Sequence, residues 1–260
     1  MTERKLVTHA GAAALLLMVA AATAASGQSV TARTVRFSSE SLGGQATFAV
    51  LVPPDYDSSS TRYPVVYLLH GGTQNHTAFP ARTWFGKEIS RRNLIAVMPH
   101  VPQILYNTRA DRGAPPFEAF IAELVSYVDA HYRTVSTRDG RAIAGLSMGG
   151  FGAVASGLSH PELFATVGAF SGAFSAGREA MLAAGVAALP VERAPFFYLA
   201  CGVEDAVLPA SRDFVALLRQ REIAHEYREV PGGHTWDVWD PQTLAFLDTV
   251  TARPGFAPSR

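Results

Sequence analysis

Short apolar runs that each end in Gly, Ser or Pro recur along this chain, and they constrain its fold more than any other feature. They are VVYLLHGG (65–72), LIAVMP (94–99), RAIAGLS (141–147), ATVGAFSG (165–172) and FFYLACG (196–202). Runs this short and this apolar are typical of strands buried on both faces. Segments with helical periodicity lie between them. This alternation predicts a mostly parallel sheet with helices on both faces, the α/β class.

The remaining elements fit one domain over residues 27–260. Two opening strands are expected in 34–42 and 45–54, where β-branched and aromatic residues are frequent. Helices are expected near 83–92, 117–131, 149–160, 211–222 and 240–253. No linker rich in Pro, Gly or Ser divides this region. The Ala-rich connection 172–195 could carry a short cap helix over a site, and its length predicts a small cap or none.

The N-terminus has the pattern of a targeting segment. Arg4 and Lys5 precede an apolar stretch from about Ala10 to Ala22, which ends in the small residues Ala22-Thr23-Ala24. The stretch is too short to span a membrane comfortably. It predicts a signal peptide over 1–26, a secreted or periplasmic protein, and no stable membrane insertion after cleavage. An uncleaved N-terminal anchor is the alternative.

Charge and cysteine content exclude several classes of function. The 22 Lys and Arg residues offset 22 Asp and Glu residues, and no basic block with interleaved aromatic residues occurs, so nucleic acid is not an expected partner. A small, neutral or amphiphilic partner fits better. The single cysteine, Cys201, lies in an apolar run and cannot form an intrachain disulfide. The sequence has no HExxH motif or Cys/His cluster, so neither a metal nor another cofactor is expected.

The stretch AIAGLSMGGFGA (142–153) contains a G-x-S-x-G match centred on Ser147. Alone the match is weak, because a serine in a Gly-rich loop is common. Here a predicted strand precedes it and a predicted helix follows. Gly145 and Gly149 suit a sharp strand-to-helix turn, where side chains would collide with neighbouring elements. Such a turn would present the Ser147 hydroxyl as a nucleophile beside a helix N-terminus.

A serine nucleophile needs a base and a group that orients the base. His234 follows the last predicted strand, and Glu204 and Asp205 follow the strand at 196–202. The order Ser, acid, His is that of α/β-hydrolases. Asp205 is preferred over Glu204 because a shorter carboxylate is held more rigidly, and the other seven histidines are less suited as bases. The alternative for His234 is a loop histidine packed by nearby tryptophans.

The remaining candidate groups complete a catalytic site. Backbone N–H groups of Gly72 and Met148 are the expected oxyanion hole, with the first supplied by the HGG loop and the second by the residue after the nucleophile. Trp84, Tyr106 and Trp236 are candidate walls of a substrate pocket, although each is equally compatible with the core.

With these residues in view, the chain resembles the esterase D-like family of α/β-hydrolases, which includes feruloyl and acetyl xylan esterases, S-formylglutathione hydrolases, siderophore esterases and mycolyltransferases. The resemblance is carried by VPPDYDSSSTRYPVVYLLHGG, FIAELVSYVDAHYRT, GRAIAGLSMGGFGA, HPELFATVGAFSGAF, CGVEDAVL and YREVPGGHTWDVW. It implies an α/β-hydrolase fold with Ser147 as nucleophile, Asp205 as acid, His234 as base, and Gly72 and Met148 as the oxyanion hole.

The resemblance implies hydrolysis of small-molecule or polysaccharide-linked carboxylic esters through an acyl-enzyme. Two features depart from the family: QILYNTRAD (103–111) replaces a WYTN-like stretch, and 172–195 is short. Export argues against the cytosolic S-formylglutathione hydrolase role. An acyltransferase of the mycolyltransferase type, using a sugar or lipid hydroxyl as acceptor, and a non-catalytic binding protein on the same fold are the alternatives. The sequence does not indicate an oligomeric state.

Overall fold

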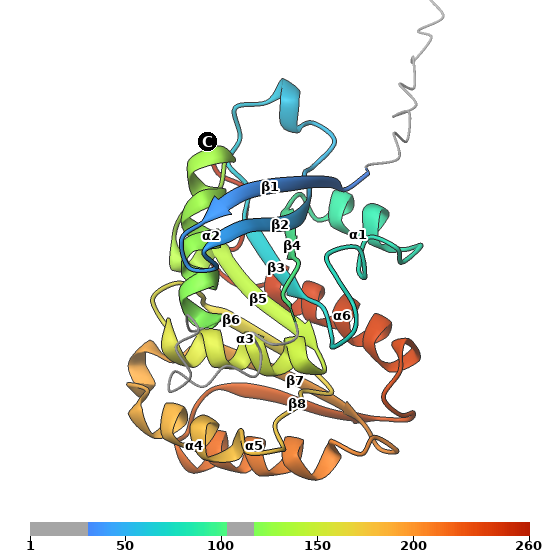
Figure 1. Cartoon of the computed structure of the whole chain (residues 1–260), viewed down its shortest axis with the longest axis vertical. Coiled ribbons are helices and arrows are strands. Elements are labelled where there is room, and N and C mark those ends of the chain that lie inside the picture. The colour runs from blue at the N-terminus through green and yellow to red at the C-terminus, as the bar shows by residue number, and fades with distance from the viewer. Residues whose placement is uncertain (1–30, 103–116) are drawn as a thin grey trace, which may run out of the picture.

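The computed structural model describes residues 31–102 and 117–260, and within these ranges the strands form one eight-stranded sheet (Figure 1). Its order is β1-β2-β4-β3-β5-β6-β7-β8. The strands are β1 Arg33–Ser39, β2 Gly44–Leu51, β3 Val65–Leu69, β4 Ile95–Pro99, β5 Arg141–Leu146, β6 Thr166–Phe170, β7 Phe196–Gly202 and β8 His225–Val230.

Strands β3 to β8 pair in parallel, and β1 and β2 add an antiparallel edge. The mostly parallel sheet expected from the apolar runs is therefore confirmed. Every residue of β3, β4, β5 and β6 is buried, because helices cover both sides of these strands. Strand β8 lies at the edge and accordingly carries partly exposed and charged residues.

The helices divide between the two faces of the sheet (Figure 1). They are α1 Phe85–Arg91, α2 Phe117–His131, α3 Met148–Ser159, α4 Glu179–Ala188, α5 Leu208–Gln220 and α6 Trp236–Thr251. Buried residues of α2, α3, α4 and α5 share one core, and those of α1 and α6 share the other. In β3, Val65 and Tyr67 point to the first core and Val66 to the second, as the strand pleat requires.

The structure decides between the two possibilities left for 172–195, a small cap or none, and it corrects the start of the last helix. Helix α4 contributes Leu182 and Val186 to the same core as α3 and α5, so it belongs to the helical layer and is not a cap. Helix α6 begins at Trp236, not near residue 240, although Pro241 lies inside it. A proline at this position removes the hydrogen bond to the carbonyl of Asp237, and its ring crowds that carbonyl. Burial of Val238 in the first turn favours the helix despite this loss.

Parts of the sequence interpretation fall on residues outside those described. The expected signal peptide over 1–26 and the candidate pocket residue Tyr106 both do so. Within 31–102 and 117–260, no helix is long and apolar enough to cross a membrane.

Phe246 offers a test of the packing between α6 and the sheet. Its ring is fully buried and contacts Phe170 and Tyr198 edge-on, with ring centroids 5.9 and 5.8 Å away. Phe246→Ala should lower the free energy of unfolding by about 3–5 kcal/mol, because it leaves a cavity beneath the sheet. Urea denaturation measures this loss. The control Met181→Ala, at a 46% exposed position of α4, should change stability by less than about 0.5 kcal/mol; equal losses would contradict this packing.

Candidate active site

Ser147 occupies a tight turn between β5 and α3. Its backbone has φ 53° and ψ −118°, a region that residues with side chains rarely adopt. A Cβ on Gly145 would overlap the carbonyl of Gly149, and a Cβ on Gly149 would overlap the carbonyl oxygens of Leu69 and His70. The two glycines thus allow the start of α3 to lie against the end of β3. This close approach holds the strained Ser147 at the carboxyl edge of the sheet.

The structure brings Ser147, His234 and Asp205 into one line of hydrogen bonds. His234 Nε2 lies 2.9 Å from Ser147 Oγ, and His234 Nδ1 lies 2.8 Å from Asp205 Oδ2. The Asp205 carboxylate is fully buried, whereas the His234 side chain is 40% exposed. A carboxylate accepts hydrogen bonds, so Nδ1 carries the proton and the Nε2 lone pair faces the serine hydroxyl. This is the arrangement that allows imidazole to take a proton from serine.

The loops that carry the acid and the base are bonded to each other. Asp205 follows β7 and His234 follows β8, and these strands are parallel neighbours. The backbone N–H of Glu204 donates to the carbonyl of Gly232 at 3.0 Å. A Cβ on Gly202 would overlap that same carbonyl, so the loops could not approach with a larger residue there. Glu204 is exposed, in agreement with the preference for Asp205.

Aromatic side chains support the His234 ring. Trp239 packs edge-to-face with it at a centroid distance of 4.9 Å, and Trp236 packs edge-to-face with Trp239 at 5.5 Å. The Arg82 guanidinium lies over Trp236 at 4.7 Å, and its Nε donates to both Asp240 oxygens at 3.0 and 3.1 Å. Trp236 therefore supports the base through its packing. Its proposed contact with substrate stays a prediction.

The HGG loop after β3 lies directly against the nucleophile. A Cβ built on Gly71 would lie 3.4 Å from Ser147 Cβ. The N–H of Gly71 donates to Gln74 Oε1 at 3.0 Å. In the part of the chain that the structure describes, neither the N–H of Gly72 nor that of Met148 donates a hydrogen bond. Met148 begins α3, whose first N–H groups have no partner within the helix.

Sequence reasoning used the glycines of HGG and missed His70. This histidine is 2% exposed; its Nδ1 donates to the carbonyl of Gly71 at 2.7 Å, and its Nε2 accepts from the N–H of Val101 at 3.0 Å. Burial lowers the pKa of His70 to about 4, so the ring is neutral at ordinary pH. Its position beside the two glycines was the signal available in the sequence.

The other candidate residues have different surroundings. Trp84 is half-buried at the start of α1 and packs against Phe85 at a centroid distance of 5.6 Å. Its Nε1 is buried without a hydrogen-bond partner among the described residues. Its role as a pocket wall stays a prediction. Within those same residues, no group of three or more His, Cys, Asp or Glu side chains could hold a metal ion.

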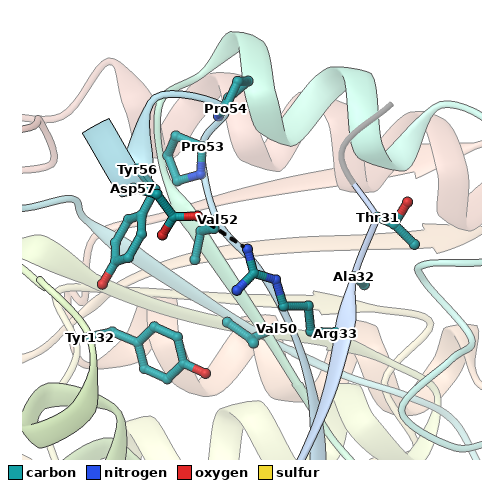
Figure 2. Close-up of a pocket in the computed structure, with 10 residues that line it drawn as sticks. All are labelled: Thr31, Ala32, Arg33, Val50, Val52, Pro53, Pro54, Tyr56, Asp57 and Tyr132. Carbon is teal, nitrogen blue, oxygen red and sulfur yellow. Dashed lines mark hydrogen bonds and ion pairs between the residues drawn. The ribbon is translucent and has the colours of Figure 1, made fainter. Parts of the chain in front are cut away.

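A cavity of about 540 Å³ lies at the end of the sheet where the parallel strands begin, and Figure 2 shows the residues that line it. It is lined by Thr31, Ala32, Arg33, Val50, Val52, Pro53, Pro54, Tyr56, Asp57 and Tyr132. Strand β2 runs antiparallel to β4, so its end lies where the parallel strands begin. Ser147 lies where they end. An exposed Arg33–Asp57 ion pair at 3.5 Å crosses this cavity, which is separate from the candidate active site.

Comparisons with known proteins identify the family of this chain. The sequence matches the Esterase family over residues 39–196. Esterase Rv1288 of Mycobacterium tuberculosis is 31% identical over 84% of this chain but only 58% of its own length, so the chain spans part of that relative. An acetyl esterase of Caldicellulosiruptor saccharolyticus is 24% identical, covering 79% of this chain and 92% of that protein.

The solved structures include a ferulic acid esterase that superposes with a TM-score of 0.77 at 25% identity. The match covers 86% of this chain and 99% of the other. This likeness and the sheet order confirm the α/β-hydrolase fold. The matched residues include the HGG loop and Ser147. The chain therefore belongs to the Esterase family, which confirms its resemblance to the esterase D-like α/β-hydrolases.

Proposed function

We propose that this chain is a serine esterase that hydrolyses carboxylic esters through an acyl-enzyme. The observation that carries the proposal is the line of hydrogen bonds from Asp205 through His234 to Ser147, at 2.8 and 2.9 Å. A nucleophile, a base and a buried acid in hydrogen-bond contact are what activation of a serine hydroxyl requires. Family membership supports ester hydrolysis as the reaction.

The first half of the reaction forms the acyl-enzyme. His234 Nε2 takes the proton of Ser147 Oγ as that oxygen bonds to the ester carbonyl carbon. The carbonyl oxygen becomes an oxyanion, which the N–H groups of Gly72 and Met148 stabilise. The buried Asp205 carboxylate stabilises the imidazolium. His234 then donates the proton to the leaving alkoxide as the carbon–oxygen bond breaks.

The second half releases the acid. Water gives a proton to His234 Nε2 and attacks the acyl carbon, forming a second oxyanion at the same two N–H groups. Collapse of this intermediate breaks the bond to Ser147 Oγ, which recovers its proton from His234. The N-terminus of α3 adds partial positive charge at this position.

The proposed substrate is a small-molecule or polysaccharide-linked ester. Relatives described as acetyl esterase and ferulic acid esterase support this class. The 40% exposure of the His234 side chain supports it as well, since a bulky alcohol needs access to the base. Helix α4 belongs to the helical layer, so among the described residues it leaves the site without a cap.

We also propose that residues 1–26 are a signal peptide and that the mature protein is secreted or periplasmic. Expression in a host with a general secretion pathway should yield an exported protein whose N-terminus lies near residues 25–27. Intact mass and N-terminal sequencing of the extracellular and periplasmic fractions measure this. Retention of Met1 or of the apolar stretch in the exported protein would instead support an uncleaved anchor.

Removal of the Ser147 hydroxyl tests the nucleophile. Ser147→Ala should lower kcat/KM on p-nitrophenyl acetate and butyrate by about 10⁴-fold or more, because no acyl-enzyme can form. A fluorophosphonate probe should label the wild-type protein and leave this variant unlabelled. Ser159→Ala, at the exposed end of α3, is the matched control and should keep wild-type activity. Near-normal turnover by Ser147→Ala would refute the assignment.

Two adjacent acidic residues offer a test of the acid. Asp205→Asn should lower kcat by about 10⁴-fold, because the amide no longer stabilises imidazolium and favours the wrong tautomer of His234. Glu204→Gln removes an exposed carboxylate one residue away and should leave kcat within about twofold of wild type, the change expected away from the site. Steady-state kinetics on p-nitrophenyl acetate compares them. Equal effects of the two substitutions would contradict the role of Asp205.

A further inference from the structure

We propose that His70 is a positioning residue that sets the direction of the Gly72 N–H, one of the two proposed oxyanion donors. The inference rests on the proposed function, because it concerns how the same site stabilises its transition state. Among the described residues, His70 is hydrogen-bonded to the carbonyl of Gly71 and the N–H of Val101, neither of which belongs to the Ser147–His234–Asp205 line. It would act through the backbone of the HGG loop.

The peptide unit between Gly71 and Gly72 is planar, which links the directions of its carbonyl and its N–H. In a trans peptide the carbonyl of one residue and the N–H of the next point in opposite directions, and no cis peptide occurs among the described residues. His70 Nδ1 donates to the Gly71 carbonyl at 2.7 Å, and the N–H of Gln74 donates to the same oxygen at 3.4 Å. These two hydrogen bonds hold the Gly71 carbonyl toward His70 and Gln74. The Gly72 N–H, on the opposite side of the same peptide plane, therefore points away from them.

The loop needs such a restraint because its backbone is strained. Thr73, the residue after Gly72, has φ 63°, an unfavourable conformation for a β-branched residue. Gly71 lies close enough to Ser147 that an added Cβ would be 3.4 Å from the serine Cβ. A small rotation of the peptide next to the nucleophile would thus move the donor away from the developing oxyanion.

His70 is itself held in one orientation and one tautomer. Nδ1 faces a carbonyl and must carry a proton, whereas Nε2 faces the N–H of Val101 and must offer a lone pair. The ring is buried and stacks on His100 at a centroid distance of 5.8 Å. The side chain therefore joins the HGG loop to the segment after β4, and only the neutral ring satisfies both partners.

Two substitutions separate the contacts of His70. In His70→Asn, the amide nitrogen occupies the place of Nδ1 and can still donate to the Gly71 carbonyl. In His70→Gln, the amide oxygen occupies the place of Nε2 and can still accept from Val101. The proposal predicts that His70→Gln lowers kcat/KM on p-nitrophenyl acetate by about 10- to 100-fold, short of the 10²- to 10³-fold loss of a deleted donor. His70→Asn should stay within about threefold of wild type.

Activity is expressed per site titrated to completion with a fluorophosphonate, so that partial unfolding does not count as lost catalysis. A trifluoromethyl ketone forms a tetrahedral adduct with serine. Its affinity for His70→Gln should fall below its affinity for the wild-type protein by the same factor as kcat/KM falls. KM should change little, because the N–H acts mainly on the transition state. His225, the first residue of β8, donates through Nδ1 to the carbonyl of Ile223 at 2.7 Å. His225→Gln is the matched control and should keep wild-type kcat and inhibitor affinity.

The outcomes are distinct. Equal kcat per titrated site in both His70 variants and wild type, or a larger loss in His70→Asn than in His70→Gln, would overturn the inference. If His70→Gln does not fold, His70→Asn still decides it, since a loss above tenfold despite the retained donor contradicts the proposal.

Long-range ¹H–¹⁵N NMR of the wild-type protein should show His70 protonated at Nδ1; protonation at Nε2 would also overturn the inference. Wild-type activity in Ser147→Ala would refute the proposed function instead.

Discussion

The close approach of helix α3 to strand β3 is the contact on which the rest of the site depends. It is possible because Gly149 presents no Cβ to the carbonyl oxygens of Leu69 and His70. The turn before α3 is thereby drawn against the HGG loop, and Ser147 takes a backbone conformation with positive φ. Nucleophile, helix N-terminus and HGG loop are thus brought together by one packing constraint in the backbone.

The second half of the site depends on neighbouring parallel strands. Strands β7 and β8 end side by side, and the loops that follow them are joined by a backbone hydrogen bond from Glu204 to Gly232. This geometry turns Asp205 inward and leaves Glu204 in solvent. Trp239 then packs edge-to-face with the His234 ring. Each half of the site is built from backbone packing that small residues permit.

Much of this arrangement is predictable because it follows from local patterns. The buried strands are apolar throughout, and the Gly-Leu-Ser-Met-Gly turn has the residue sizes its sterics require, so fold class and Ser147 follow from the sequence. Asp205 and His234 each follow a predicted strand, in the order acid then histidine, and this order predicts them as the acid and the base that act with Ser147. The start of α6 was misplaced because Pro241 is a local helix breaker, whereas burial of Val238 is a tertiary effect. The place of α4 in a helical layer depends on Leu182 and Val186 meeting distant residues of the core. His70 was missed because its role depends on which backbone atoms face its two nitrogens.

If Ser147 is the nucleophile, ester turnover passes through a covalent bond to its Oγ. Intact mass spectrometry during turnover of a slowly deacylating aryl ester, followed by peptide mapping, detects this bond. The protein should gain the mass of one acyl group, located on Ser147, and the adduct should disappear as the ester is consumed. Turnover with no adduct under conditions where deacylation limits the rate, or an adduct on another residue, would contradict this role of Ser147.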